Sequence, residues 1–235
     1  FKPLRKELQM VFQNTLSALN PRQRIGNILE DILKIHSNLD AAERREKVVE
    51  VLKKVGLSED HYFRFPHELS GGQVQRLGIA SALVIGPKLI VCDEPVSALD
   101  VSIQAQILNM LMQLQKELGL SLLFISHDIG VIRFISDRIG VMYLGTLVEE
   151  TDTEELFANP PHPYTKGLFA SVPDPYIERD GFSELSGEQP VRTEDFKGCA
   201  FSTRCPNATE KCRQEAPVFR EVKAGHKVAC HMVEE

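Results

Sequence analysis

The stretch that decides the fold is Leu69-Ser70-Gly71-Gly72-Gln73. Ser70 can cap the helix that follows, and glycines, which have no Cβ, let backbone N–H groups approach a phosphate. Taken alone, the stretch is equally typical of an ordinary Ser-Gly-Gly turn before an amphipathic helix, because short glycine motifs often occur by chance. The segments further along the chain decide between these two interpretations.

More short segments with polar residues follow this stretch. The apolar run Leu89-Ile90-Val91-Cys92 ends in Asp93-Glu94-Pro95, which is typical of a buried parallel strand that delivers carboxylates at its C-terminal end. Ser97-Ala98-Leu99-Asp100 comes next, and a second apolar run at residues 122–125 ends in Ser126-His127-Asp128. This alternation of strands and helices favours an α/β fold with a largely parallel sheet.

The motifs LSGGQ, DEP, SALD and SHD, in this order and spacing, resemble those of the nucleotide-binding subunits of ABC transporters. The similarity is greatest to the ATPases of bacterial oligopeptide and dipeptide importers, which Asn20-Pro21-Arg22 and His162-Pro163-Tyr164-Thr165 also resemble. The resemblance implies an incomplete P-loop NTPase-like ABC ATPase fold with a helical signature subdomain and a small C-terminal cysteine-containing appendage. It also implies an ATP-hydrolysing subunit that powers peptide import, with ATP sandwiched between two such subunits.

Asp93 and Glu94 are the candidate acidic residues for ATP hydrolysis. Mg²⁺ prefers oxygen ligands and usually keeps several waters, so Asp93 at the end of a strand suffices to hold it. Glu94 is the candidate base that polarises water for attack on the γ-phosphate. A solvated loop is the alternative for adjacent acids, but it fits poorly with acids that end an apolar run.

Gln13 and His127 are the other candidate catalytic residues. In the resembled family Gln13 is the Q-loop glutamine, which reaches the magnesium and the attacking water and couples the site to the membrane subunits. His127 would contact the γ-phosphate and stabilise developing charge. Without the other motifs, a lone glutamine would be a surface residue and a lone histidine a structural one. A Ser-His-Asp triad at residues 126–128 is rejected, because adjacent residues rarely converge as a triad must.

The resemblance implies that the signature acts across a subunit interface. In ABC ATPases this motif contacts the nucleotide bound by a second ATPase subunit, identical or different. The residues assigned here to that contact are Ser70, Gly71, Gly72 and Gln73, and Asp100 would lie at the dimer interface. Further implied partners are two transmembrane permease subunits and, indirectly, a peptide-binding protein.

A phosphate-binding loop is not found in the sequence. ATP binding on this fold needs a Gly-x-x-x-x-Gly-Lys-Ser/Thr loop, and none of the 15 glycines belongs to one. The aromatic residue that stacks on adenine in the family is also absent. We therefore expect the resemblance to run from the Q-loop to the C-terminus, without the N-terminal part, and the chain alone to bind ATP poorly and not to turn it over.

Two parts are expected along the chain: residues 1–150 as the ABC ATPase domain without its N-terminal portion, and residues 151–235 as the C-terminal extension. A helical subdomain is expected at about residues 25–80, with a capping box at Asp40 and Glu43 and a helix end at Gly56. Predicted helices cover residues 25–56, 74–84, 101–118, 129–135 and 149–157. Predicted strands cover residues 8–13, 89–93, 120–125 and 138–143, with a loop at 14–22 and a proline-rich connector at 159–165 that Pro173 and Pro175 continue.

The cysteines are unevenly distributed. Cys92 is expected to be a small buried apolar residue, whereas Cys199, Cys205, Cys212 and Cys230 follow the spacing C-x5-C-x6-C-x17-C. Disulfides are disfavoured in a cytoplasmic protein, zinc usually has a tighter cysteine pair, and an iron–sulfur cluster accepts looser spacing. Peptide-importer ATPases that resemble Gly198-Cys199-Ala200-Phe201 and Arg204-Cys205-Pro206 can carry a [4Fe–4S] cluster. The resemblance thus implies this cluster, with Zn²⁺ as the alternative and His226 and His231 as alternative ligands.

The charge and the hydrophobic pattern limit the class of protein. A net charge of −6 over 235 residues disfavours a nucleic-acid binder held by a basic surface. No apolar run reaches the ~18 residues needed to span a bilayer, so we expect a soluble cytoplasmic protein. The resemblance implies that it is peripheral, at the cytoplasmic face of the membrane. The alternatives are a non-catalytic remnant with a metal-binding tail and an importer of another cargo, such as nickel. An ABC-type ATPase of DNA repair or translation is less favoured, because no coiled-coil insertion or tandem cassette occurs.

Overall fold

The computed structural model describes residues 4–171 and 197–233. The chain divides into two compact units, residues 1–128 and 129–235, and each unit has its own sheet. This division differs from the boundary expected near residue 150, because Glu150 lies within a strand that pairs on both of its sides in the second unit. Pro173 and Pro175, expected to continue a connector, lie outside the described residues.

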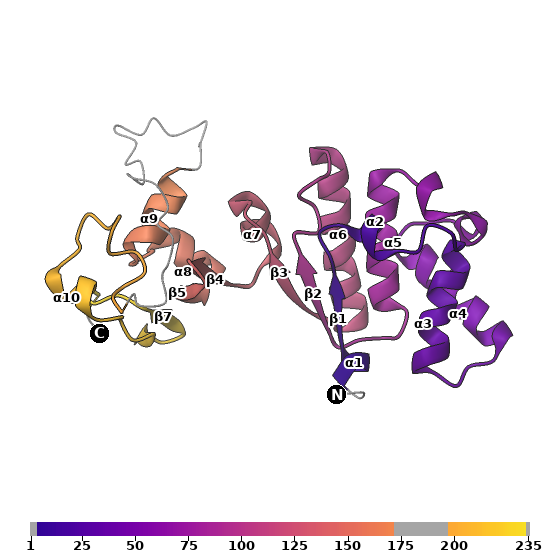
Figure 1. Ribbon diagram of the computed structural model, residues 1–235, viewed down its shortest axis with the longest axis horizontal. Helices are drawn as coiled ribbons and strands as arrows, with labels where there is room; N and C mark the ends of the chain where they lie inside the picture. The colour runs from indigo at the N-terminus through magenta and orange to yellow at the C-terminus, as the bar shows by residue number, and fades with distance from the viewer. Residues whose placement is uncertain (1–3, 172–196, 234–235) are drawn as a thin grey trace. The chain divides into compact units, whose positions relative to one another are not determined.

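The first unit is built on a parallel sheet with the strand order β1-β2-β3 (Figure 1). Its strands are β1 (Leu8–Val11), β2 (Leu89–Asp93) and β3 (Ser121–Ile125). The register places Val11 beside Cys92, and Asp93 beside Ile125. Because parallel strands end at the same edge of a sheet, the residues that follow them emerge together there. The α/β fold with a parallel sheet is confirmed for this unit.

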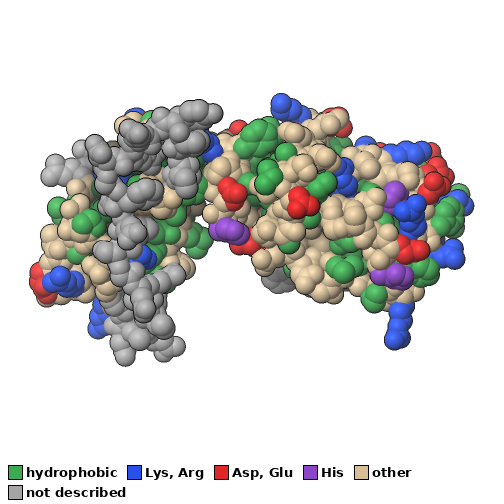
Figure 2. All heavy atoms as spheres, turned by 90° about the horizontal axis from the view of Figure 1, so that it is seen from above, with side chains coloured by type: hydrophobic (Ala, Val, Ile, Leu, Met, Phe, Trp, Pro, Cys, Tyr) green, Lys and Arg blue, Asp and Glu red, His purple; other side chains and the backbone are tan. Residues whose placement is uncertain are grey.

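The two faces of this sheet differ in burial. Val11, Ile90 and Cys92 on one face are buried. Asp93 alternates with Cys92 and therefore belongs to the other face, whose exposed hydrophobic residues are Leu8, Met10, Leu123 and Ile125. Figure 2 shows that hydrophobic side chains are interspersed with acidic and basic ones over the visible surface. The face that carries Asp93 is thus the more exposed face of the sheet.

The helical subdomain expected at about residues 25–80 consists of α3 (Ile25–His36), α4 (Ala41–Lys54), the short 3-10 helices η1 (Glu59–Phe63) and η2 (Pro66–Glu68), and α5 (Gly71–Leu83). The capping box at the start of α4 is confirmed. Asp40 Oδ1 accepts from the Glu43 amide at 2.9 Å, and Glu43 Oε2 accepts from the Asp40 amide at 2.7 Å. Gly56, which follows α4, has a φ of 75°, a conformation that favours glycine.

The helix predicted at residues 101–118 is present as α6 (Val101–Leu118), which ends at Gly119. Residues 14–22, expected as a loop, instead begin with one turn of helix, α2 (Thr15–Ala18). Asn14 stabilises this turn, because its Oδ1 accepts a hydrogen bond from the Ser17 amide at 3.2 Å. A further helical turn, α1 (Leu4–Glu7), precedes β1.

The second unit contains an antiparallel sheet with the strand order β4-β5-β7-β6. Its strands are β4 (Arg138–Tyr143), β5 (Thr146–Asp152), β6 (Arg220–Lys223) and β7 (His226–Val228). Its helices are α7 (Ile129–Ile135), α8 (Thr153–Ala158), α9 (Pro163–Ala170) and α10 (Glu210–Gln214). A largely parallel sheet therefore describes the first unit and not the second.

Two predicted elements of the second unit are wrong. The helix expected at residues 149–157 is the end of β5 followed by α8, because residues 146–152 pair with β4 and β7. The connector expected at residues 159–165 contains the start of α9. Pro163 occupies the first turn of that helix, where proline is well tolerated, and His162 caps it by accepting from the Tyr164 amide at 3.1 Å.

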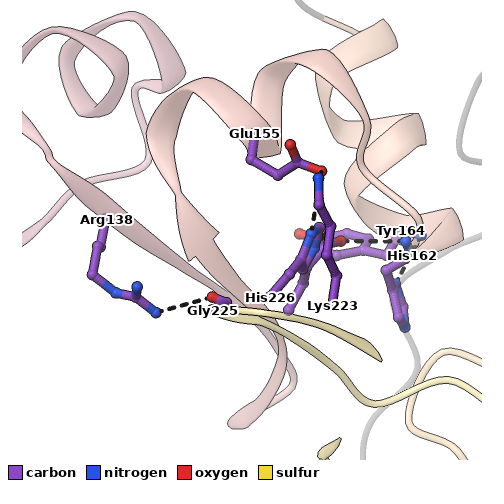
Figure 3. A network of polar contacts seen from close by, with 8 residues as sticks. Arg138, Glu155, His162, Tyr164, Lys223, Gly225 and His226 are labelled. Atoms are coloured by element: carbon purple, nitrogen blue, oxygen red, sulfur yellow. Dashed lines mark hydrogen bonds and ion pairs between the residues drawn. The ribbon is translucent and has the colours of Figure 1, made fainter. Parts of the chain in front are cut away.

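A network of polar contacts joins the β6–β7 hairpin to β5 and α8 (Figure 3). Glu149 is fully buried, and its Oε1 lies 2.9 Å from His226 Nε2. Its other oxygen accepts from the backbone amide of His162 at 3.3 Å. Nearer the surface, Lys223 pairs with Glu155 at 2.9 Å, and Arg138 reaches the carbonyl of Gly225 at 3.3 Å. Since a buried carboxylate is costly unless it is hydrogen-bonded, Glu149 depends on the donors that the hairpin and α9 supply.

His162 gives the second unit a pH-dependent stability. Burial lowers the pKa of His162 to about 4 from an ordinary value of 6.5, so its neutral form is favoured in the folded chain. Between pH 6.5 and pH 4 the unfolded chain binds the extra proton, and the stability that His162 contributes is lost as the pH falls through this window.

We expect His162→Asn to remove this dependence while keeping a cap for α9, because asparagine also accepts from a backbone amide. In urea unfolding, the free energy of unfolding of the unsubstituted chain should fall relative to that of the variant by up to about 3 kcal/mol between pH 7 and pH 4. A difference between the two proteins that stays constant over this range would contradict the prediction.

Candidate functional site

The edge of the parallel sheet brings together Gln13, Glu94 and His127, the residues assigned to catalysis. Gln13 Nε2 donates to Glu94 Oε2 at 2.9 Å, and His127 Nδ1 lies 3.1 Å from Glu94 Oε1. The carboxylate is thus held between an amide and an imidazole that come from the ends of two other strands. The side chain of Glu94 is 26% exposed and that of His127 is 73% exposed, so the histidine is open to solvent.

The backbone of Glu94 adopts a conformation that is unusual for its residue type. Its φ is 45°, in the left-handed region that residues with a Cβ rarely enter. The Glu94 amide donates to the Ile125 carbonyl at 3.0 Å, which extends the pairing of β2 with β3 by one residue. The carbonyl of Glu94 accepts from Ser97 Oγ at 3.1 Å. These contacts on both sides of the residue hold the strained backbone in place.

Asp93 ends β2 immediately before this residue, on the more exposed face of the sheet. Among residues 4–171 and 197–233, no group of three or more His, Cys, Asp or Glu side chains is arranged to hold a metal ion. Mg²⁺ in nucleotide sites is usually held by one or two protein oxygens together with waters and the substrate phosphates. Asp93 and Gln13 could supply such oxygens. Asp93 is the last residue of β2, and Gln13 follows the end of β1 by two residues, so both lie at the edge of the sheet where the candidate site is.

The signature stretch forms the N-terminus of α5. Ser70 Oγ accepts from the Gln73 amide at 3.4 Å, and Gln73 Oε1 accepts from the Ser70 amide at 3.0 Å. This is a reciprocal capping box, so Gln73 stabilises the helix start. The capping role expected for Ser70 is confirmed.

The glycines of the signature lie against the segment that begins α6. A Cβ at Gly72 would lie 2.6 Å from Ile103 Cγ2, and a Cβ at Gly71 would lie 3.8 Å from Leu99 Cδ2. Asp100 is the N-cap residue of α6, between these two contacts. The fold thus brings the signature and the Asp100 segment side by side, and Gly72 is needed for their close approach.

The cysteines of the C-terminal region form a second group. All are free, and the Cys199 amide donates to the Cys212 carbonyl at 2.7 Å. Burial raises the pKa of the Cys199 thiol, and the nearby thiols of Cys212, Cys230 and Cys205 raise it further. Cys199 and Cys205 both pack against the hydrophobic cluster that contains Phe201, but the described residues form no metal-binding group. The expected [4Fe–4S] cluster is accordingly not supported by the structure, and neither is zinc.

The histidines named as alternative ligands have other partners. His226 is paired with Glu149, and His231 Nε2 lies 3.0 Å from the Glu215 carbonyl. Both imidazoles thus contact groups other than the four cysteines in this structure. Cys92 is fully buried, which raises the pKa of its thiol to about 12, so the expectation of a small buried apolar residue is confirmed.

Sequence reasoning missed two polar residues near the site. Thr15 and Gln75 are both buried, and Thr15 Oγ1 lies 2.9 Å from Gln75 Oε1. For Gln75 a signal was available, because it is a polar residue between the apolar residues Val74 and Leu77 of α5 and therefore needs a buried partner. Nothing in the sequence near Thr15 pointed to a partner in α5.

Comparisons with known proteins agree with this arrangement. The profile described as "ABC transporter" matches residues 1–97, and the profile "Oligopeptide/dipeptide transporter, C-terminal region" matches residues 148–212. The dipeptide transport ATP-binding protein DppF of Haemophilus influenzae is 50% identical over 98% of this chain and 71% of its own length. The oligopeptide transport ATP-binding protein AppF of Bacillus subtilis is 49% identical over the same shares.

A solved structure supports the fold. The ATP-binding cassette MJ0796, dimeric in a post-hydrolysis state with ADP and phosphate, has a TM-score of 0.57 and 34% identity. The likeness covers 65% of this chain and 65% of that one. Fold and site thus define an ATP-binding cassette. Within that class, the chain belongs to the family of oligopeptide and dipeptide transport ATP-binding proteins of ABC transporters. No helix in the described residues is long and apolar enough to cross a membrane.

The strained backbone at Glu94 predicts a difference between two substitutions. Glu94→Gly and Glu94→Ala both remove the carboxylate, but only glycine adopts a positive φ without strain. We expect the free energy of unfolding of Glu94→Gly to exceed that of Glu94→Ala by about 1 kcal/mol. Denaturant unfolding of both variants measures this, and a less stable glycine variant would contradict a left-handed Glu94.

Proposed function

We propose that this protein powers the import of dipeptides or oligopeptides by hydrolysing ATP as a subunit of an ABC transporter. The observation that carries the proposal is the contact of Glu94 with Gln13 and His127 at the C-terminal edge of the parallel sheet. The peptide cargo follows from the relatives, which are named as dipeptide and oligopeptide transport proteins. The family match over residues 148–212, described for oligopeptide/dipeptide transporters, supports the same cargo.

Each residue at the edge of the sheet has a part in the proposed hydrolysis. Glu94 accepts the proton of the attacking water, since its carboxylate is partly exposed and held in one place by its two neighbours. Gln13 orients that water through its amide. His127, which is mostly exposed, donates toward the γ-phosphate and stabilises the charge that develops there. Mg²⁺, when bound beside Asp93 and Gln13, neutralises phosphate charge.

The signature acts on a different nucleotide in this proposal. Ser70, Gly71, Gly72 and Gln73 contact the ATP bound by a second ATPase subunit, and Asp100 lies at the interface between the two subunits. The packing of Gly72 against Ile103 supports this, because the signature then lies close to the start of α6, which Asp100 precedes. The related cassette MJ0796 is dimeric in its structure with ADP and phosphate. Residues 25–80 face two membrane permeases at the cytoplasmic side, and a peptide-binding protein supplies the cargo.

Because the sequence contains no phosphate-binding loop, hydrolysis is tested with the chain joined to such a loop and assembled with its permeases in vesicles. We expect Glu94→Gln to lower kcat for ATP by at least about 100-fold with little change in KM, because the general base is lost while nucleotide contacts remain. Glu117→Gln, at an exposed position on α6 outside residues 25–80, is the matched control and should keep the rate. Equal rates of ATP hydrolysis for Glu94→Gln and the unsubstituted protein would favour a non-catalytic remnant. Uptake of Ni²⁺ rather than of peptides would exclude peptides as the cargo.

We further propose that the four C-terminal cysteines hold a metal centre, with a [4Fe–4S] cluster as the first candidate and Zn²⁺ as the second. The hydrogen bond from the Cys199 amide to the Cys212 carbonyl supports this, because it joins the segments that carry two of the four cysteines. An all-thiolate donor set suits either metal. Such a centre would stabilise the small C-terminal region.

Metal analysis of anaerobically purified protein tests this proposal. We expect an absorption band near ~400 nm and about four irons per chain, lost in Cys205→Ser and kept in Cys92→Ala, which alters the cysteine outside the group. One zinc without iron would replace the cluster by a zinc site. A protein without iron or zinc would overturn both assignments.

A further inference from the structure

A buried hydrogen bond joins the loop that carries Gln13 to the helix that carries the signature. The Thr15 hydroxyl lies 2.9 Å from Gln75 Oε1 on α5 and 3.1 Å from the carbonyl of Phe12. Thr15 and Gln75 are each 6% exposed. A hydroxyl has only one proton to donate. The Thr15 hydroxyl is therefore the single donor that lies between an acceptor in the loop and an acceptor on the helix.

The amide of Gln75 completes this bridge. Within the described residues, Gln75 Nε2 is buried and has no hydrogen-bond partner in the present orientation. Turning the amide by half a rotation lets Nε2 donate to Thr15 Oγ1, while the Thr15 hydroxyl donates to the Phe12 carbonyl. Both orientations connect the backbone of the loop to α5 through Thr15.

Gly78 provides the space in which Thr15 sits. A Cβ at position 78 would lie 2.5 Å from Thr15 Cγ2 and 2.8 Å from Thr15 Oγ1. Gln75 and Gly78 are three residues apart on α5 and therefore share one face of the helix. The threonine is thus fixed against this helix by a hydrogen bond and by close packing at the same time.

The two loop residues that take part in the bridge lie on either side of Gln13 in the sequence. Phe12, whose carbonyl accepts from Thr15, precedes Gln13, and Thr15 follows it by two residues. The side chain of Gln13 reaches Glu94 Oε2. On the other side, Gln75 lies two residues beyond Gln73 in the same helix that Ser70 caps. A shift of α5 therefore acts on the backbone that aims Gln13 at Glu94.

We propose that Thr15, Gln75 and Gly78 are positioning residues that couple the location of the signature helix to the placement of Gln13 beside Glu94. The catalytic consequence rests on the proposed function. Because the signature of one subunit contacts the nucleotide of the other in that proposal, the bridge carries the state of one nucleotide site to the glutamine of the second. Thr15 acts only through Gln13 and touches no reacting atom.

The coupling itself is tested on this chain by NMR of the Gln13 side-chain amide, assigned by its loss in Gln13→Ala. Thr15→Val keeps the shape of the side chain and removes the hydroxyl, and we expect it to shift the Gln13 amide resonance toward its position in Glu94→Ala. Thr15→Ser restores the hydroxyl and should restore the resonance. Ser81→Ala removes another hydroxyl from α5, one that bonds the Leu77 carbonyl at 3.0 Å, and should leave Gln13 unchanged.

A folded Thr15→Val chain with an unmoved Gln13 resonance would overturn the proposal. If that variant does not fold, Gln75→Met combined with Thr15→Val replaces both polar partners by apolar groups of similar shape. The same shift is expected there, and its absence would equally overturn the coupling.

The catalytic consequence is tested by measuring ATP hydrolysis in the assembled transporter, again with the phosphate-binding loop joined to the chain. We expect Thr15→Val to lower kcat on the order of tenfold or more with KM for ATP nearly unchanged, and Thr15→Ser to recover it. An unchanged kcat in Thr15→Val would overturn the catalytic consequence. If Glu94→Gln hydrolyses ATP normally, the proposed function fails, and the NMR result still decides whether the bridge positions Gln13.

Discussion

The parallel pairing of β1 and β3 on either side of β2 is the constraint on which the candidate site depends. Since the strands run in one direction, their C-terminal ends meet at one edge and release Gln13, Glu94 and His127 there. The pairing also extends one residue past β2, because the Glu94 amide donates to the Ile125 carbonyl. This last hydrogen bond holds Glu94 at a φ of 45°, so the same ladder that builds the sheet also sets the direction of the carboxylate.

A second constraint is the close approach of α5 to its neighbours, which glycine makes possible at two positions. Gly72 lets the start of α5 lie against Ile103 of α6, and Gly78 lets the middle of α5 lie against Thr15. Side chains at these positions would push the helix away from both segments. The helix that carries the signature is therefore located by one contact toward the Asp100 segment and by another toward the loop of Gln13.

The sequence predicted the parts of the molecule whose signals are local. The apolar run before Asp93, the capping box at Asp40 and the glycine after α6 each lie within a few residues of the element they define. The antiparallel second sheet was not predicted, because β5 pairs with β7 about 80 residues further along the chain. The pairs Thr15–Gln75 and Glu149–His226 were missed for the same reason: each joins residues far apart in sequence, and single residues of these types are common in loops and on surfaces.

The energetics of the Thr15–Gln75 bridge argue that stability alone does not account for it. A buried hydrogen bond of this kind contributes about 1 kcal/mol net, whereas a buried amide group left without a partner costs about 1–3 kcal/mol. In either orientation of its amide, Gln75 keeps one polar atom that Thr15 does not satisfy, so an apolar pair of the same shape would hold α5 and the loop together at least as well. An apolar pair would not fix the orientation of the loop, because apolar contacts do not depend on direction as hydrogen bonds do. A hydroxyl that must face both the Phe12 carbonyl and Gln75 fixes the backbone on either side of Gln13, and it is this backbone that determines whether the amide reaches Glu94.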